Sequence, residues 1–237
     1  KKGGIKHLCV HCKGKSGYSL ILDTLEHDRT ILTYKGVNDS LKYREVPLKK
    51  LNTKWFYFSS MVGESYKTLE KLAQFAIKNN IKIAFNPSTY IAEKGASFLK
   101  NILNKTTLLV LNKEEAGLVS GKKDMEEILI KLRSLGPNIV VVTNGKKSVN
   151  AIDDKYIYTC NPPYIKIVDT TGAGDAFAST FLSGLLRKKP LDFCIKLGIA
   201  NAMSVISYYG AKNNLLSYNK ALRFMKRLKC RVKKKKY

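Results

Sequence analysis

Long apolar runs are absent from this sequence of 237 residues. Its longest apolar stretches, such as IVVVT at 139–143, have the length of one β-strand, whereas a membrane-spanning helix needs about 20 consecutive apolar residues. We therefore expect neither a membrane span nor a signal peptide. Because 44% of the residues are hydrophobic, the chain has enough apolar material for a sizeable core in one domain with an appendage.

Cysteines are few, and their spacing does not complete a zinc site. One close pair, Cys9 and Cys12, is flanked by His7 and His11, but no second cysteine pair exists to complete a tetrahedral site. In an extended segment the two thiols would also point to opposite faces. We favour ordinary reduced thiols, which indicate a cytoplasmic protein, over a metal or redox site. The other cysteines are Cys160, Cys194 and Cys230.

Acidic residues are scarce, with 18 against 43 basic residues and a formal net charge of +25. The lysines are spread along the whole chain, and the one dense basic block, at 223–236, contains no acid. Such an excess makes nucleic acid a partner to consider. We favour a solvated helix end followed by a frayed basic tail, and the alternative is a tail that attracts RNA or other anions.

The rest of the sequence alternates between strand and helix patterns. Helices of this length between strands predict a parallel, doubly wound sheet. The expected strands are 18–26, 29–34, 55–60, 81–86, 107–111, 138–143 and a hairpin at 148–160. The expected helices are 65–80, 95–104, 112–121, 124–135, 173–188, 191–209 and 217–229.

Polar residues follow most of the expected strands of the sheet. Asn86 comes after one strand, Asn112 and Glu115 after the next, and Thr143 and Gly145 after the third. In open α/β sheets, ligands bind outside the carboxyl ends of the strands. These side chains are therefore candidates for contacts with phosphate, a metal ion or hydroxyl groups.

The stretch VDTTGAGDAF at 168–177 combines a glycine-rich turn with a following helix. Gly172 and Gly174 let the backbone N–H groups of 172–175 turn inward at a helix N-terminus, which is an anion site. Asp175 would repel a bound anion if it served only as a cap. Facing a substrate hydroxyl, it accepts the proton as that hydroxyl attacks phosphorus. We favour phosphoryl transfer over a plain capped helix start.

This stretch closely resembles the C-terminal signature of the ribokinase-like (PfkB) family of carbohydrate kinases. DTTGAGDAFASTFLSGLL is highly specific, and NKEEA matches the family's N-x-x-E element less specifically. The segments SGYSL, DRTIL, AFNPSTY, VVVTNGKKS and YYGAK follow in the family order, so the resemblance covers nearly the whole chain. It implies a doubly wound, mostly parallel α/β sheet flanked by helices, with a small β lid.

The resemblance also implies how the chain is organised. We expect lid strands and first connections at 1–45, an α/β core at 46–229 and a basic tail at 230–237. The family's usual first strand and its two sugar-holding motifs are not matched. We therefore expect that a substantial N-terminal portion is absent, which leaves the activity of this chain as given an open question.

The matched positions receive roles from the family. Asp175 corresponds to the catalytic base, and Gly172, Ala173 and Gly174 correspond to the anion hole. Residues implied at the nucleotide are Asn112, Glu115, Thr143, Gly145, Asn201 and Gly210, with Glu115 holding Mg²⁺ through water. Asp169 and Thr171, beside the Gly210 loop, match a monovalent-cation site. Glu64 and Asn86 are weaker candidates for substrate contacts, since a helix-start charge and a turn-forming Asn explain them as well.

These roles predict an ATP-dependent kinase that phosphorylates a sugar hydroxyl, with Mg²⁺ and K⁺ as candidate cofactors. A nucleoside kinase of the same fold is the close alternative. A noncatalytic basic remnant that binds nucleic acid is the alternative from another class. The expected partners are a small sugar or nucleoside and a second copy of the chain paired through the lid strands, whereas we expect no membrane partner and no specific nucleic acid.

Overall fold

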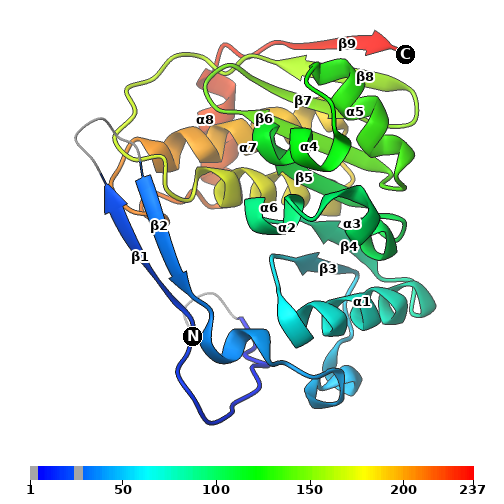
Figure 1. Ribbon diagram of the computed structural model, residues 1–237. Helices are drawn as coiled ribbons and strands as arrows, with labels where there is room; N and C mark the ends of the chain where they lie inside the picture. Colours follow the sequence, from blue (N-terminus) through cyan, green and yellow to red (C-terminus); the bar gives the residue numbers. More distant parts are fainter. Residues whose placement is uncertain (1–4, 24–28) are drawn as a thin grey trace. The chain divides into compact units, whose positions relative to one another are not determined.

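The computed structural model describes residues 5–23 and 29–237 (Figure 1). The chain divides into two compact units, Lys1–Lys82 and Ile83–Tyr237. The predicted boundaries at 45/46 and 229/230 differ from this division and stay a prediction. Across the described residues, no helix has both the length and the apolar character that crossing a membrane requires.

The first unit contains the small β sheet that the sequence predicts as a lid. Strands β1 (Tyr18–Asp23) and β2 (Arg29–Tyr34) pair antiparallel, with Tyr18 opposite Tyr34. Residues 24–26 of the expected first strand lie outside the described residues. The remaining elements are the 3₁₀ turns η1 (Gly36–Asp39), η2 (Tyr43–Glu45) and η3 (Leu48–Lys50), strand β3 (Trp55–Phe58) and helix α1 (Gly63–Lys78).

Helix α1 is tied to the connection before it by two buried hydroxyl groups. Ser65 Oγ donates to Asn38 O (2.6 Å) and accepts from the Leu41 N–H (2.9 Å). Thr68 Oγ1 donates to Leu41 O (2.7 Å). These bonds satisfy polar backbone groups of the 38–41 connection, so α1 and that connection form one packed body.

The second unit carries the main run of the central sheet. Its strand order is β4-β5-β6-β7-β8-β9. The pairs β4/β5 and β5/β6 are parallel, and the pairs from β6 to β9 are antiparallel. The strands are β4 (Lys82–Phe85), β5 (Leu108–Asn112), β6 (Ile139–Asn144), β7 (Ser148–Ile152), β8 (Tyr156–Cys160) and β9 (Val232–Lys236).

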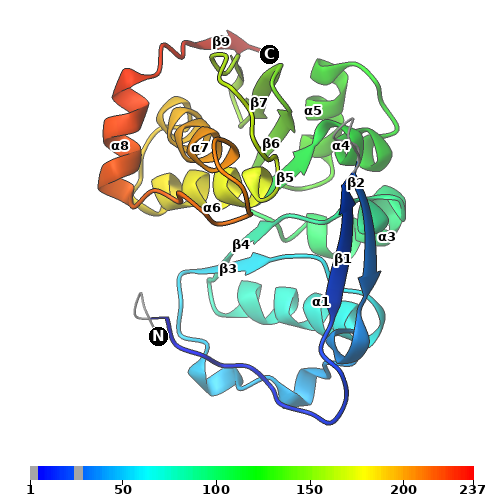
Figure 2. The ribbon, with the colours of Figure 1, turned by 90° about the vertical axis from the view of Figure 1, so that its left-hand side faces the viewer.

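Helices cover both faces of this sheet, with α3, α4 and α5 on one side and α6, α7 and α8 on the other (Figure 2). The parallel strands β5 and β6 are therefore buried on both faces, which explains their continuous apolar runs. The prediction of a doubly wound α/β fold is confirmed. The helices are α2 (Thr89–Ala92), α3 (Gly95–Leu103), α4 (Lys113–Ser120), α5 (Met125–Ser134), α6 (Ala173–Leu186), α7 (Leu191–Ile206) and α8 (Tyr218–Arg227).

The basic segment after α8 is a strand rather than a frayed end. β9 pairs antiparallel with β8, with Val232 opposite Cys160. Lys234 Nζ lies 3.6 Å from the centre of the Tyr156 ring, and Lys235 Nζ lies 2.8 Å from Glu126 Oε1. A run of four lysines carries no strand pattern of its own, because the partners that hold it lie far away in the sequence.

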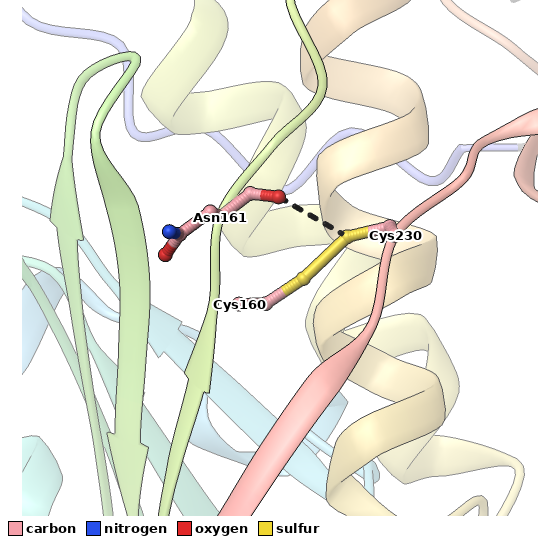
Figure 3. The surroundings of a disulfide bond; sticks show 3 residues. All are labelled: Cys160, Asn161 and Cys230. Atoms are coloured by element: carbon pink, nitrogen blue, oxygen red, sulfur yellow. Dashed lines mark hydrogen bonds between the residues drawn. A yellow bond between two sulfur atoms is a disulfide. The ribbon is translucent and has the colours of Figure 1, made fainter.

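Cys160 and Cys230 are joined by a disulfide at the point where β8 ends and β9 approaches (Figure 3). The expectation of reduced thiols is wrong for these two residues, because only the β8–β9 pairing brings them together. Cys9 and Cys12 are exposed free thiols, and Cys194 is a buried one. Burial, with Asp192 nearby, raises the pKa of Cys194 to about 12, which keeps it a protonated thiol.

We expect the disulfide between Cys160 and Cys230 to stabilise the protein and to hold β9 against β8. It spans 70 residues, and a loop of that size corresponds to about 4 kcal/mol in the chain-entropy estimate. We expect Cys230→Ser to lower the unfolding temperature and to speed amide hydrogen exchange in β9. Calorimetry and exchange mass spectrometry check this, with Cys9→Ser as the control. Unchanged values in Cys230→Ser would contradict it.

Candidate active site

The carboxyl ends of β4, β5 and β6 bring three of the predicted residues to one edge of the sheet. Asn112 lies directly opposite Thr143 in the parallel register of β5 and β6. Asn86, which follows β4, donates from Nδ2 to Val110 O (2.8 Å) on β5. This edge is where ligands bind in open α/β sheets.

Asn112 and Glu115 form a reciprocal capping box at the start of α4. Asn112 Oδ1 accepts from the Glu115 N–H (2.8 Å), and the Asn112 N–H donates to Glu115 Oε2 (3.0 Å). Thr89 Oγ1 approaches Glu115 Oε1 at 3.4 Å. The Glu115 carboxylate is therefore fixed in position by groups from β5 and α2.

Burial raises the pKa of Glu115, while the hydrogen bonds from Asn112 and Thr89 oppose that rise. The residue is only 8% exposed, yet each carboxylate oxygen has lone pairs beyond the one used here. Such a rigid, oxygen-only donor suits a hydrated Mg²⁺. Thr89 was not identified from the sequence as a member of this network. The segment NPST indicates a turn and a helix start, but it gives no sign of a contact with Glu115, which lies 26 residues later.

Asp169 organises the turn that leads into α6. Its Oδ1 accepts from the N–H (2.8 Å) and the Oγ1 (2.6 Å) of Thr171, and its Oδ2 accepts from the Gly210 N–H (2.9 Å). The Val168 N–H donates to Ile206 O at the end of α7 (2.8 Å). The structure thus brings together the three residues that the sequence groups as a cation site.

The N-terminus of α6 is left open by the residue that begins it. Gly172 is the N-cap, with a left-handed φ of 79°, and no side chain caps the helix there. The first N–H groups of a helix have no acceptor within it; here the Ala173 N–H donates to Thr170 O in the preceding turn (3.3 Å). Both Gly174 and Asp175 are exposed in this first turn. Positive helix-end amides and one carboxylate therefore lie side by side at the surface.

Gly172 cannot be replaced without moving its surroundings. A Cβ at this position would lie 2.8 Å from both the Cα and the carbonyl carbon of Ala211. The close approach of the two loops thus depends on a residue without a side chain. Gly174 differs, because a Cβ there meets nothing within 4 Å.

Two other predicted nucleotide residues occupy different settings. Gly145 lies in the tight turn between β6 and β7, with a left-handed φ of 51°. Asn201 is buried in α7, where Nδ2 donates to Thr180 Oγ1 (2.6 Å) and Oδ1 accepts from the Leu216 N–H (2.9 Å). Asn201 thus links α6, α7 and the segment before α8, and its role at a nucleotide stays a prediction.

Glu64 lies in the first turn of α1, within the first unit. Its Oε2 is 3.2 Å from Lys67 Nζ, and both side chains are largely exposed. This arrangement is typical of a carboxylate that stabilises a helix N-terminus. A contact between Glu64 and a substrate stays a prediction.

An open hollow of about 520 Å³ adjoins the capping box and the end of β6. It contains the residues that directly follow Asn112 and Thr143 in the chain, and its charge is dominated by lysine. Such a lining suits the phosphate groups of a ligand. The hollow is lined by Lys113, Glu114, Gly117, Lys122, Lys123, Ile128 and Asn144.

Comparison with known proteins places this geometry in context. A family model described as pfkB family carbohydrate kinase matches residues 1–217. An uncharacterized sugar kinase of Archaeoglobus fulgidus is 27% identical over 91% of this chain and 86% of its own length. A cytidine kinase of Thermococcus kodakarensis is 32% identical over 74% of this chain, and the match spans 63% of that kinase.

Solved structures agree on the fold. The ribokinase of Thermotoga maritima superimposes with a TM-score of 0.78 at 21% identity, over 92% of this chain and 72% of that one. The nucleoside kinase of Methanocaldococcus jannaschii has a TM-score of 0.72 at 22% identity, over 90% of this chain and 69% of that one. At these identities the likeness concerns the fold alone.

The two glycines of the α6 turn predict different tolerance to alanine. We expect Gly172→Ala to destabilise the protein by more than about 1 kcal/mol, because a left-handed Ala is strained and its Cβ meets Ala211. Gly174→Ala, the matched control, should keep or raise stability, because it adds a helix former where there is space. Urea unfolding of both variants measures this, and equal stabilities would contradict it.

Proposed function

The chain belongs to the pfkB family of carbohydrate kinases, and on that basis we propose that it transfers the γ-phosphoryl group of ATP to a hydroxyl group of a sugar. The single observation that carries the proposal is the N-terminus of α6, which begins at a left-handed glycine without a side-chain cap and has the exposed residues Gly174 and Asp175 in its first turn. Family membership supports a phosphotransferase, and the relatives include kinases of both sugars and nucleosides.

The N-terminus of α6 supplies the two groups that phosphoryl transfer needs from a protein. Its amides stabilise the negative charge that develops on the transferred group, because they point in one direction and are fixed before the reaction. The Asp175 carboxylate takes the proton from the attacking hydroxyl. Asn86, at the same edge of the sheet as Asn112, is proposed to contact the acceptor, and Glu64 is a weaker candidate.

Asn112 and Glu115 are proposed to hold Mg²⁺ through water. Both Glu115 oxygens already accept protein hydrogen bonds, so a bridging water fits them better than direct coordination. A bound Mg²⁺ would neutralise negative charge on the phosphate groups. Thr143, Gly145 and the lysine-lined hollow beside α4 are proposed to receive the rest of the nucleotide, with Gly210 and the Asn201 region bordering it.

A monovalent-cation role for Asp169 and Thr171 is a further part of the proposal, and K⁺ is the candidate ion. The carboxylate of Asp169 joins the two loops that would surround such an ion. We also propose a homodimer formed through the lid strands, and a cytoplasmic location that is supported by the free thiols Cys9, Cys12 and Cys194 but not by the disulfide-bonded pair. The apolar side chains on β1 and β2 that are about half exposed support the dimer.

A nucleoside acceptor is the second candidate, and the 32% identity with a cytidine kinase favours it. Incubating the longest natural form of the protein with ATP and panels of sugars and nucleosides, and following ADP formation, separates the two acceptors. Turnover with sugars supports the main proposal, and turnover confined to nucleosides replaces it. If no ADP forms with either the sugars or the nucleosides, the result favours the noncatalytic alternative.

Asp175 generates the sharpest test of the mechanism. Asp175→Asn keeps the shape of the side chain but cannot accept a proton, so we expect kcat to fall by roughly 10²–10⁴-fold while ATP binding persists. Asp192→Asn is the matched control, because Asp192 lies in the first turn of α7 as Asp175 does in α6. Steady-state kinetics and calorimetric ATP titration measure both effects. A normal kcat in Asp175→Asn removes it from the mechanism.

If Glu115 holds Mg²⁺ through water, changing it should alter how the reaction rate depends on the Mg²⁺ concentration. Glu115→Gln retains the capping box but loses the charge that supports a hydrated cation, so we expect a higher Mg²⁺ concentration for half-maximal rate. Glu114→Gln removes the same charge from the exposed neighbouring position and should leave that concentration unchanged. Reaction rates measured over a range of Mg²⁺ concentrations give the half-maximal concentration for each variant. Identical titration curves for the two variants would argue against a magnesium role for Glu115.

A further inference from the structure

Positive charge dominates the solvent side of α8, where Asn219 is the one exposed neutral residue of the helix. Four exposed residues define this α8 basic face: Lys220, Arg223, Lys226 and Arg227. On a helix of 3.6 residues per turn they share one side. On the opposite side Ala221 is buried and Met225 is half-buried. Leu222 and Phe224, at the borders of the face, are also half-buried, so the apolar residues of α8 are already used in packing.

Neighbouring segments extend the positive charge at both ends of α8. The guanidinium of Arg187, at the end of α6, lies 4.0 Å from the ring centre of Tyr218 in the first turn of α8, and Lys188 and Lys189 follow it at the surface. At the other end, Arg231 comes directly after Cys230, which the disulfide fixes to the sheet (Figure 3).

This charge is not balanced locally. Residues 193–237 contain no Asp or Glu, whereas helices such as α1 and α5 carry acids together with their lysines. Among the described residues of this region, Lys235 forms an ion pair with Glu126, at β9 and not on α8. Arginine is concentrated here as well: of the seven arginines in the sequence, four are Arg187, Arg223, Arg227 and Arg231.

We propose that the α8 basic face binds the phosphate backbone of double-stranded DNA without reading its base sequence. The planar guanidinium pairs with phosphate through two parallel hydrogen bonds. A duplex presents one negative charge per about 1.7 Å of its axis, a density that suits a surface without acids. The face itself carries no aromatic residue on which single-stranded bases would stack.

Charge and packing favour DNA over the other polyanionic surfaces. An amphipathic helix that lies in a membrane inserts apolar side chains into it, but those of α8 face the protein. Specific reading of bases requires side chains to enter a groove, where Arg or Lys pairs with guanine and Asn or Gln with adenine. In the proposed complex the long cationic side chains of α8 contact phosphate instead, because phosphate contacts position a protein on the backbone without carrying sequence information.

The test uses the full chain and a fluorescently labelled 20-base-pair DNA, with fluorescence anisotropy measured over a range of salt concentrations. The variant R223Q/R227Q removes two cations one helical turn apart. We expect it to bind at least roughly 10-fold more weakly near 0.1 M salt and to lower the salt slope by about 1.8, since each phosphate contact contributes about 0.9. R223K/R227K, which keeps the charge, should bind with intermediate affinity.

The matched control is K67Q/K71Q, which removes two exposed cations with the same spacing from α1. It should change the affinity less than twofold. If both variants weaken binding equally, net charge alone accounts for DNA binding. If R223Q/R227Q binds DNA as tightly as the unchanged protein, α8 does not contact DNA. Either outcome overturns the proposal. Tighter binding to single-stranded RNA, to phosphatidylserine vesicles or to polyglutamate would overturn it too. Thermal melting verifies that each variant is folded.

Discussion

The carboxylate of Asp169 is the interaction on which the candidate active site depends. It accepts hydrogen bonds from Thr171 and from the Gly210 N–H, and so joins two loops that are about 40 residues apart in the chain. Hydrogen bonds to a charged acceptor are roughly twice as strong as neutral ones. Because Gly172 follows directly and touches the second loop, the direction in which α6 begins is fixed by these contacts.

The helix starts of the second unit differ in whether a side chain occupies their first amides. In α4 and α5 these amides donate to the side chains of Asn112 and Asp124, whereas α3, α6, α7 and α8 begin without a side-chain cap. A helix end whose donors are already satisfied has little left to offer a phosphate, whereas an uncapped end retains donors and its dipole. What distinguishes α6 among the uncapped helices is the left-handed glycine at its N-cap, held beside the loop that Asp169 binds through Gly210.

Features that depend on local chemistry could be read from the sequence. The helix start at Asn112 and the turn at Gly172 depend on residues only a few positions apart, and the alternation of strands and helices predicted the fold. Features that depend on distant partners could not be read. Thr89 reaches Glu115, Asn201 is enclosed by Thr180 and Leu216, and Cys160 meets Cys230 only because the sheet brings them together.

The pairing of β9 with β8 also affects how the protein is made. β8 is synthesised more than 70 residues before β9 (Tyr156–Cys160 and Val232–Lys236), so at typical translation rates its outer edge waits several seconds for its partner. An unpaired strand edge is a template for association with other chains. Once β9 has added itself, the last strand of the described sheet is made of consecutive lysines, and such an edge resists pairing with another molecule. The strand that completes the sheet thus also protects it from aggregation.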